Sequence, residues 1–99
     1  MTLDSNNLEV INNTEANRFE IRLSDTHMAL AEYMIAGNNI IFTHTEVPPE
    51  YEGQGIANRL ASVALEWAKE EGKKVQPLCP FFKLYISKHP EYQGMVWGS

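Results

Sequence analysis

Two glycines stand close together near the middle of the chain, in the segment Gly53-Gln54-Gly55-Ile56-Ala57. Glycines that precede a helix let the backbone approach a ligand closely, and the first unpaired N–H groups of the helix then form an anion site without any basic side chain. Glycine pairs also serve tight turns that bind nothing. The segment therefore predicts either a phosphate site or a turn. If an anion is bound, the flanking Glu50 and Glu52 must face solvent.

A histidine and a carboxylate come shortly before these glycines, in His44-Thr45-Glu46-Val47. Alternation along a strand puts His44 and Glu46 on one face and Thr45 and Val47 on the other. Such a pair can work as a base and its orienting partner, and it can equally be a solvated contact at the end of a strand. Both interpretations stay open.

The third candidate is Cys79, which directly precedes Pro80. If Pro80 opens a helix, Cys79 is its N-cap, where the helix dipole favours a nucleophilic thiolate. Cysteine is also one of the residues most often buried as inert core, so that alternative stays open. If the strand before Cys79 runs parallel to the strand that carries His44, the two residues reach the same sheet edge. We then expect the thiol and the imidazole to be neighbours.

Short β-like segments must position these residues. Apolar or alternating runs at 8–11, 18–23, 27–36 and 39–47 predict four strands, with turns at 12–14 and 24–26. Gly37-Asn38 is a turn-prone pair that closes a hairpin between the last two. The first half is thus predicted to be an antiparallel meander.

The pattern changes to a helical one after Pro48-Pro49. Apolar residues recur at helical spacing from Ile56 to Trp67, and Gly72 is well placed as the C-terminal cap. A short strand at 75–78 and a helix at 80–88 follow, whereas 91–99 carries no clear signal. The sequence therefore predicts an α+β fold with an α/β-like core: the meander, a right-handed βαβ unit and a C-terminal helix.

Length and charge restrict the class of protein. The chain has 99 residues, 43% of them hydrophobic, and a formal net charge of −5. We expect one domain over residues 1–99 with a flexible tail at 1–7, and a monomer. Scattered cations on an acidic surface argue against nucleic acid, and the short apolar runs argue against a membrane partner, so we expect a cytoplasmic protein. The histidines and the cysteine lack metal-ligand spacing, so no metal site is expected.

Three segments carry a pattern more specific than any of these residues alone. They are His44-Thr45-Glu46-Val47-Pro48-Pro49-x-Tyr51-x-Gly53-Gln54-Gly55-Ile56-Ala57-x-x-Leu60, Val75-x-Pro77-Leu78-Cys79-Pro80-Phe81 and Tyr85-Ile86-x-x-His89-Pro90-Glu91-Tyr92. Together they closely resemble the small GNAT-like N-acetyltransferases, minimal acetyl-CoA-binding domains of about a hundred residues. The resemblance covers residues 8–96 and is looser in the meander.

The resemblance implies a GNAT-type mixed sheet with acetyl-CoA as cosubstrate and no metal. The pantetheine arm would enter between two splayed strands and pair with the strand that carries Thr45 and Val47. The diphosphate would lie on the backbone of Gly53, Gln54, Gly55, Ile56, Ala57 and Asn58. Larger GNAT enzymes usually have Gln or Arg where this chain has Glu50, and they carry N-terminal helices that form the acceptor pocket and that the small family lacks.

The expected function is transfer of an acetyl group to an amine acceptor, a small amine or a protein amine, through an acetyl-Cys79 intermediate. His44 would deprotonate or orient the thiol, and Glu46 would position His44 or attract a cationic acceptor. Direct attack of the amine on the thioester, with His44 or Glu46 as base, is a second version of the same activity. A non-catalytic CoA sensor or protein-interaction module is the alternative from another class.

Overall fold

Five strands form one mixed sheet in the order β1-β2-β3-β4-β5. The computed structural model describes residues 8–98, and the predicted tail at 1–7 lies outside them. The strands are β1 (Ile11–Asn13), β2 (Arg18–Arg22), β3 (Met28–Ala36), β4 (Asn39–Glu46) and β5 (Lys74–Pro77). Neighbours pair antiparallel from β1 to β4, whereas β4 and β5 are parallel. The predicted fold class is confirmed.

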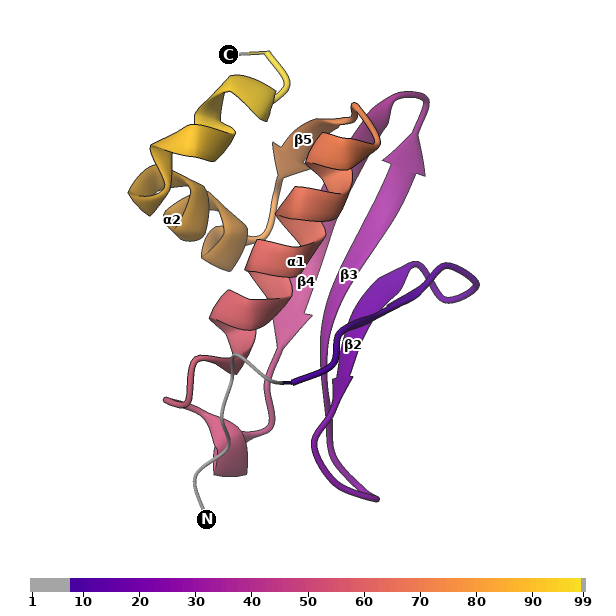
Figure 1. Ribbon diagram of the computed structural model, residues 1–99, viewed down its shortest axis with the longest axis vertical. Helices are drawn as coiled ribbons and strands as arrows, with labels where there is room; N and C mark the ends of the chain where they lie inside the picture. Colours follow the sequence, from indigo (N-terminus) through magenta and orange to yellow (C-terminus); the bar gives the residue numbers. More distant parts are fainter. Residues whose placement is uncertain (1–7, 99) are drawn as a thin grey trace.

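Two α-helices pack beside this sheet (Figure 1). Helix α1 (Ile56–Glu70) connects β4 to β5 and contacts β2, β3, β4 and β5, and α2 (Pro80–Lys88) packs against α1 and β5. Two 3-10 helices complete the described part, η2 (Pro49–Tyr51) before α1 and η3 (Pro90–Met95) after α2. Among residues 8–98, no helix has both the length and the apolar character needed to cross a membrane.

The core lies between α1 and one face of the sheet. Phe19, Ala31 and Phe42, on β2, β3 and β4, are almost fully buried, and they face Leu60 and Ala64 on α1. Alanines on the buried face of α1 let the helix lie close to the strands. The opposite sheet face keeps its side chains half-buried or exposed. The sheet is therefore packed on one side by α1.

An irregularity in the pairing of β3 with β4 decides which side chains reach the core. Tyr33 pairs with Phe42, but the next β3 residue, Glu32, pairs with His44, so Thr43 is an extra residue in β4. A β-bulge of this kind shifts the alternation by one position. Beyond Thr43 it is Thr45, paired with the buried Ala31, that faces the helices.

Two segments differ from the sequence-based expectation. Asn12 and Asn13 were expected in a turn but belong to β1, where Asn13 Nδ2 donates to Glu20 at 3.0 Å and Asn12 Oδ1 accepts from the Tyr33 hydroxyl at 2.7 Å. The segment without a signal forms η3, and Val96 then bridges to Val75. Long-range side-chain bonds and a single bridge hold these segments, and neither has a local sequence signature.

Candidate functional site

Strands β4 and β5 separate at their carboxyl ends. Their ladder ends at the pair Phe42–Pro77, while β4 continues to Glu46. The amides of Leu78 and Cys79 both donate to the Phe42 carbonyl, at 3.1 and 2.9 Å, and the chain then turns into α2. Among the described residues, no strand pairs with the β5 side of β4 beyond this point. The backbone there is available to an extended ligand, as the resemblance implied.

The N-terminus of α1 lies next to this gap. Gly55 is the N-cap with φ +80°, Gly53 has φ +81°, and the helix begins at Ile56. A positive φ is easy only for glycine, so both residues are needed for this turn. The first helical bond runs from the Arg59 amide to the Gly55 carbonyl, which leaves the amides of Ile56, Ala57 and Asn58 ahead of it.

Within the described part of the chain, no side chain caps these amides, and the first turn of α1 contains no acidic residue. The amides and the helix dipole therefore form a positive site that an anion can occupy. The geometry is compatible with the phosphate site that the glycine pair left open beside a plain turn, and the site stays a prediction.

A surface cavity of about 530 Å³ joins the strand gap to this helix end. Its walls come from the end of β4, the loop before α1, the first turn of α1 and one residue of α2. The lining residues are Thr45, Glu46, Val47, Tyr51, Glu52, Gly53, Gly55, Ile56, Ala57, Asn58 and Phe81. Most of the residues expected to bind the cosubstrate line it, although Gln54 does not. The sequence analysis missed Tyr51 and Phe81 as lining residues, because only their places in the fold bring them here.

The two flanking glutamates behave differently. The Glu50 carboxylate is turned onto His27, with Oε2 2.8 Å from Nε2, as the phosphate hypothesis requires. A backbone hydrogen bond at Glu50 and the bond from His27 lower the pKa of this carboxyl below 4.5. Glu52 is exposed but contributes to the cavity lining. Both glutamates are thus exposed to solvent, as the phosphate hypothesis requires, but Glu52 places one negative charge at the rim of the cavity.

Cys79 is the N-cap of α2, as predicted, and its side chain is buried. Its Sγ lies 3.3 Å from the hydroxyl oxygen of Thr45, and Thr45 lines the cavity while Cys79 does not. The thiol is thus one side chain away from the cavity.

His44 lies on the other side of the strand from the thiol. It pairs with Glu32 on the open sheet face, its side chain is half exposed, and its Nε2 is 3.5 Å from Glu46 Oε1. The predicted separation of His44 and Glu46 from Thr45 and Val47 is confirmed. The expected proximity of His44 to Cys79 is not found, because the bulge at Thr43 brings Thr45 to the sulfur instead.

A tyrosine cluster closes the space between α1, α2 and η3. Burial, the hydrogen bond to Glu66 and nearby carboxylates raise the pKa of Tyr92 well above 10, and its hydroxyl donates to Glu66 at 2.6 Å. Burial raises the pKa of Tyr85, partly opposed by a hydrogen bond with Ser62. Neither tyrosine lines the cavity. Among residues 8–98, no group of three His, Cys, Asp or Glu side chains is arranged to hold a metal ion.

Comparisons with known proteins agree with this geometry. A family model described as GCN5-related N-acetyl-transferase matches residues 18–95. Protein NATD1 of Gallus gallus is 34% identical over 85 residues, covering 84% of this chain and 77% of that protein. Protein NATD1 of Homo sapiens is 37% identical over 75 residues, covering 74% of this chain and 66% of that protein.

A solved structure is similar over nearly the whole fold. The solution NMR structure of a GCN5-like candidate N-acetyltransferase from Staphylococcus aureus has a TM-score of 0.73 and 30% sequence identity, over 94% of this chain and 91% of that one. The fold and the site define a small GNAT-like domain. The chain belongs to the GCN5-related N-acetyltransferase family.

Proposed function

We propose that this protein is an acetyltransferase that binds acetyl-CoA in the cavity between β4 and α1 and transfers the acetyl group to an amine. The observation that carries the proposal is the uncapped N-terminus of α1, with Gly53 and Gly55 at positive φ, beside the unpaired end of β4. A diphosphate fits the first of these features and the amides of a pantetheine arm fit the second. Membership of the family supports the same cosubstrate.

The backbone of this loop and the end of β4 would hold the cosubstrate. Gly53, Gln54, Gly55, Ile56, Ala57 and Asn58 would surround the diphosphate, and Thr45 and Val47 would pair with the pantetheine. Gln54 does not line the cavity, so we assign it a part in the shape of the turn. A thioester threaded this way would reach the gap between β4 and β5, where the acceptor must meet it.

The geometry supports direct transfer better than a covalent route. His44 and Glu46 are exposed at the end of β4, and Glu46 lines the cavity, so this pair can accept a proton from an incoming amine. The amine nitrogen attacks the thioester carbonyl, the new C–N bond forms, the C–S bond breaks, and CoA leaves as its thiol with the proton that the amine gave up. The Glu46 carboxylate also favours a cationic acceptor.

The acetyl-Cys79 intermediate stays as a second route because the thiol touches Thr45, a wall residue. His44 cannot serve it as a base from the opposite face, so Thr45 would be the neighbour of the reacting sulfur. Intact-mass measurement after incubation with acetyl-CoA decides between the routes. An added acetyl group on wild type but not on Cys79→Ala supports the intermediate, and equal labelling of both overturns it.

Turnover is the test of the activity itself. Release of free CoA from acetyl-CoA would be followed with a panel of small amines, polyamines and lysine peptides. The proposal expects amine-dependent CoA release that is lost in a Glu46→Gln, His44→Ala double variant. CoA binding without turnover on any amine would support the sensor, and absence of CoA binding would support a protein-interaction module. We keep the cytoplasm, a monomeric state and the absence of nucleic-acid and membrane partners as predictions.

A further inference from the structure

The imidazole of His27 joins two loops that are far apart in the sequence. Its Nε2 lies 2.8 Å from Glu50 Oε2, and its Nδ1 lies 3.0 Å from both Ser24 Oγ and Thr26 Oγ1. The ring also packs beside Tyr51, with 5.6 Å between ring centroids. His27 thus connects the turn between β2 and β3 to η2.

The turn around His27 is held firmly by its own hydrogen bonds. The amides of Leu23 and Ser24 both donate to the His27 carbonyl, at 3.0 and 3.2 Å. The Ser24 hydroxyl oxygen accepts from the amides of Thr26 and His27, at 3.2 and 3.1 Å. These hydrogen bonds hold the turn that carries His27 without any contribution from Glu50.

The hydrogen-bond partners define how the ring works. A carboxylate can only accept, so Nε2 donates to Glu50, while Nδ1 can accept from the two hydroxyls. Glu50 is mostly exposed and lies one residue before Tyr51, which lines the cavity. Without His27, the Glu50 carboxylate would lose this partner and could turn toward the N-terminus of α1.

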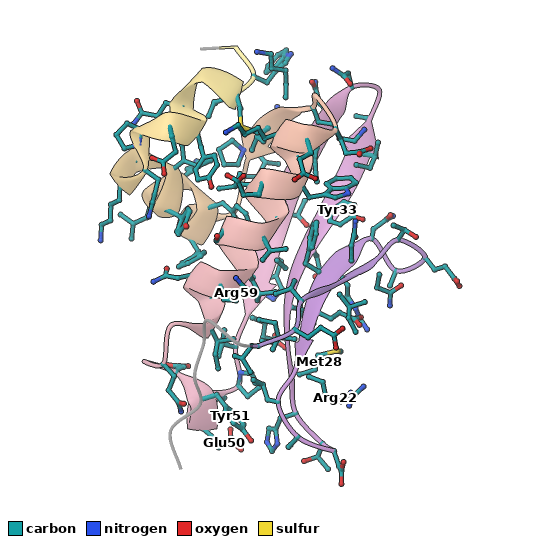
Figure 2. The ribbon with its side chains drawn as sticks, viewed as in Figure 1. Arg22, Met28, Tyr33, Glu50, Tyr51 and Arg59 are labelled. Atoms are coloured by element: carbon teal, nitrogen blue, oxygen red, sulfur yellow. The ribbon has the colours of Figure 1, made fainter. Side chains whose placement is uncertain are left out.

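We propose that His27 is a positioning residue for CoA binding and acts through Glu50. By holding the Glu50 carboxylate on the β2–β3 turn, it keeps one negative charge away from the amides of Ile56, Ala57 and Asn58. Figure 2 shows Glu50 and Tyr51 together on η2, below the N-terminus of α1. The inference rests on the proposed function, because it concerns the affinity of that cavity for an anionic cosubstrate.

The test is a calorimetric titration with CoA at low ionic strength. It compares wild type, His27→Ala, Glu50→Gln and the double variant, with His89→Ala as a matched histidine control outside the cavity. His27→Ala should weaken CoA binding about threefold to tenfold, since a freed surface charge acts at this scale. The double variant should recover to within about twofold of wild type, because the charge that His27 restrained is gone.

The outcomes separate this inference from the proposed function. If wild type binds CoA and His27→Ala binds it with the same affinity, the inference is overturned and the proposed function still stands. Equal weakening in His27→Ala and the double variant also overturns it, because the loss would then not pass through Glu50. Wild type that fails to bind CoA removes the proposed function and the inference with it. In the turnover assay, His27→Ala should raise KM for acetyl-CoA and leave kcat within about twofold.

Discussion

Negative charge at the rim is the residue-scale feature that distinguishes this cavity. Glu46 and Glu52 line it, and among the described residues no Lys, Arg or His does. CoA is strongly anionic, so under the proposed function its attraction would have to come from the backbone amides at the start of α1. Glu52 then opposes the cosubstrate, while Glu46 is placed to help the acceptor.

Glu52→Gln should therefore strengthen CoA binding. We expect a gain of about twofold to fivefold in low salt that shrinks at higher ionic strength, as for other exposed charges. Glu71→Gln is the matched control, because it removes the same charge at the opposite end of α1. Titration calorimetry at two salt concentrations measures both. A gain in the control as large as in Glu52→Gln would mean that net charge alone acts, and no gain in either would contradict the placement of the anion.

Residue-level prediction succeeded where chemistry is local. The two glycines, their neighbours and the alternation of Thr45 with Glu46 follow from backbone geometry, which short segments encode. The partners of His27 and Cys79 could not be found this way. Glu50 lies 23 positions from His27, and Thr45 lies 34 positions from Cys79, so only the fold brings them together.

The bulge at Thr43 is the element-scale feature on which the site depends. It turns Thr45 and Val47 toward the helices and leaves His44 and Glu46 on the open face. The Thr43 hydroxyl donates to the Glu32 carbonyl at 3.3 Å and helps to hold the irregular register. If Thr43 were paired in a regular strand, His44 would face the core and Thr45 would face the open side of the sheet.

Deletion of both Thr43 and His44 should destabilise the protein strongly. Without Thr43 alone, the strand would become regular and keep its present faces. With both residues gone, Thr45 follows Phe42 directly, so the face alternation reverses and Glu46 turns toward apolar neighbours, which costs several kcal/mol, about 2 or more for an unpaired polar group. Thr43→Ala keeps the bulge and loses one exposed hydrogen bond, so its cost should stay below about 1 kcal/mol. Urea unfolding compares the two variants. A double-deletion variant as stable as Thr43→Ala would contradict the dependence of the site on this face alternation.

Elements with local stop signals were predicted closely, and those held by distant contacts were not. Helix α2 runs over Pro80–Lys88 because Pro80 opens it and Pro90 ends it, and Gly37 closes the β3–β4 hairpin with φ +61°. The sequence around Thr43 contains no glycine or proline that would predict the bulge. Helix η3 is fixed largely by Tyr92 and Val96 contacts made across the fold.

At the scale of the whole molecule, buried tyrosines link stability to alkaline pH. Burial raises the pKa of Tyr33, partly opposed by Asn12, and burial also raises the pKa values of Tyr85 and Tyr92 above 10.0. In the unfolded chain these phenols ionise near pH 10, whereas in the folded chain they keep their protons. Above that pH the folded state binds more protons than the unfolded state, so stability falls as pH rises.

The free energy of unfolding should accordingly decline between about pH 9 and 11. Ionisation of the Tyr92 phenol in the unfolded chain contributes to this decline. Tyr92→Phe should be less stable near neutral pH by about 1–2 kcal/mol, because the hydrogen bond to Glu66 is lost. Its stability should nevertheless fall less steeply with rising pH, because it lacks one phenol whose pKa is raised in the folded state. Urea midpoints measured across this pH range check both effects. Identical pH slopes in the two proteins would contradict the linkage.

The molecule as a whole is a compact version of an acetyltransferase fold in which the described residues supply one anion site and one strand gap. The fold is that of the family, and the candidate site is formed largely by the backbone of residues 53–58. Both depend on α1 beginning where β4 and β5 part. The central claim is therefore that CoA binds where α1 begins.

Amide NMR spectra recorded during a CoA titration test this claim most directly. The account predicts saturable shifts that are largest at the amides of residues 53–58 and at the end of β4, with little change at the C-terminal end of α1. Millimolar CoA that leaves those amides unchanged, or shifts them less than amides of the open sheet face, would contradict it.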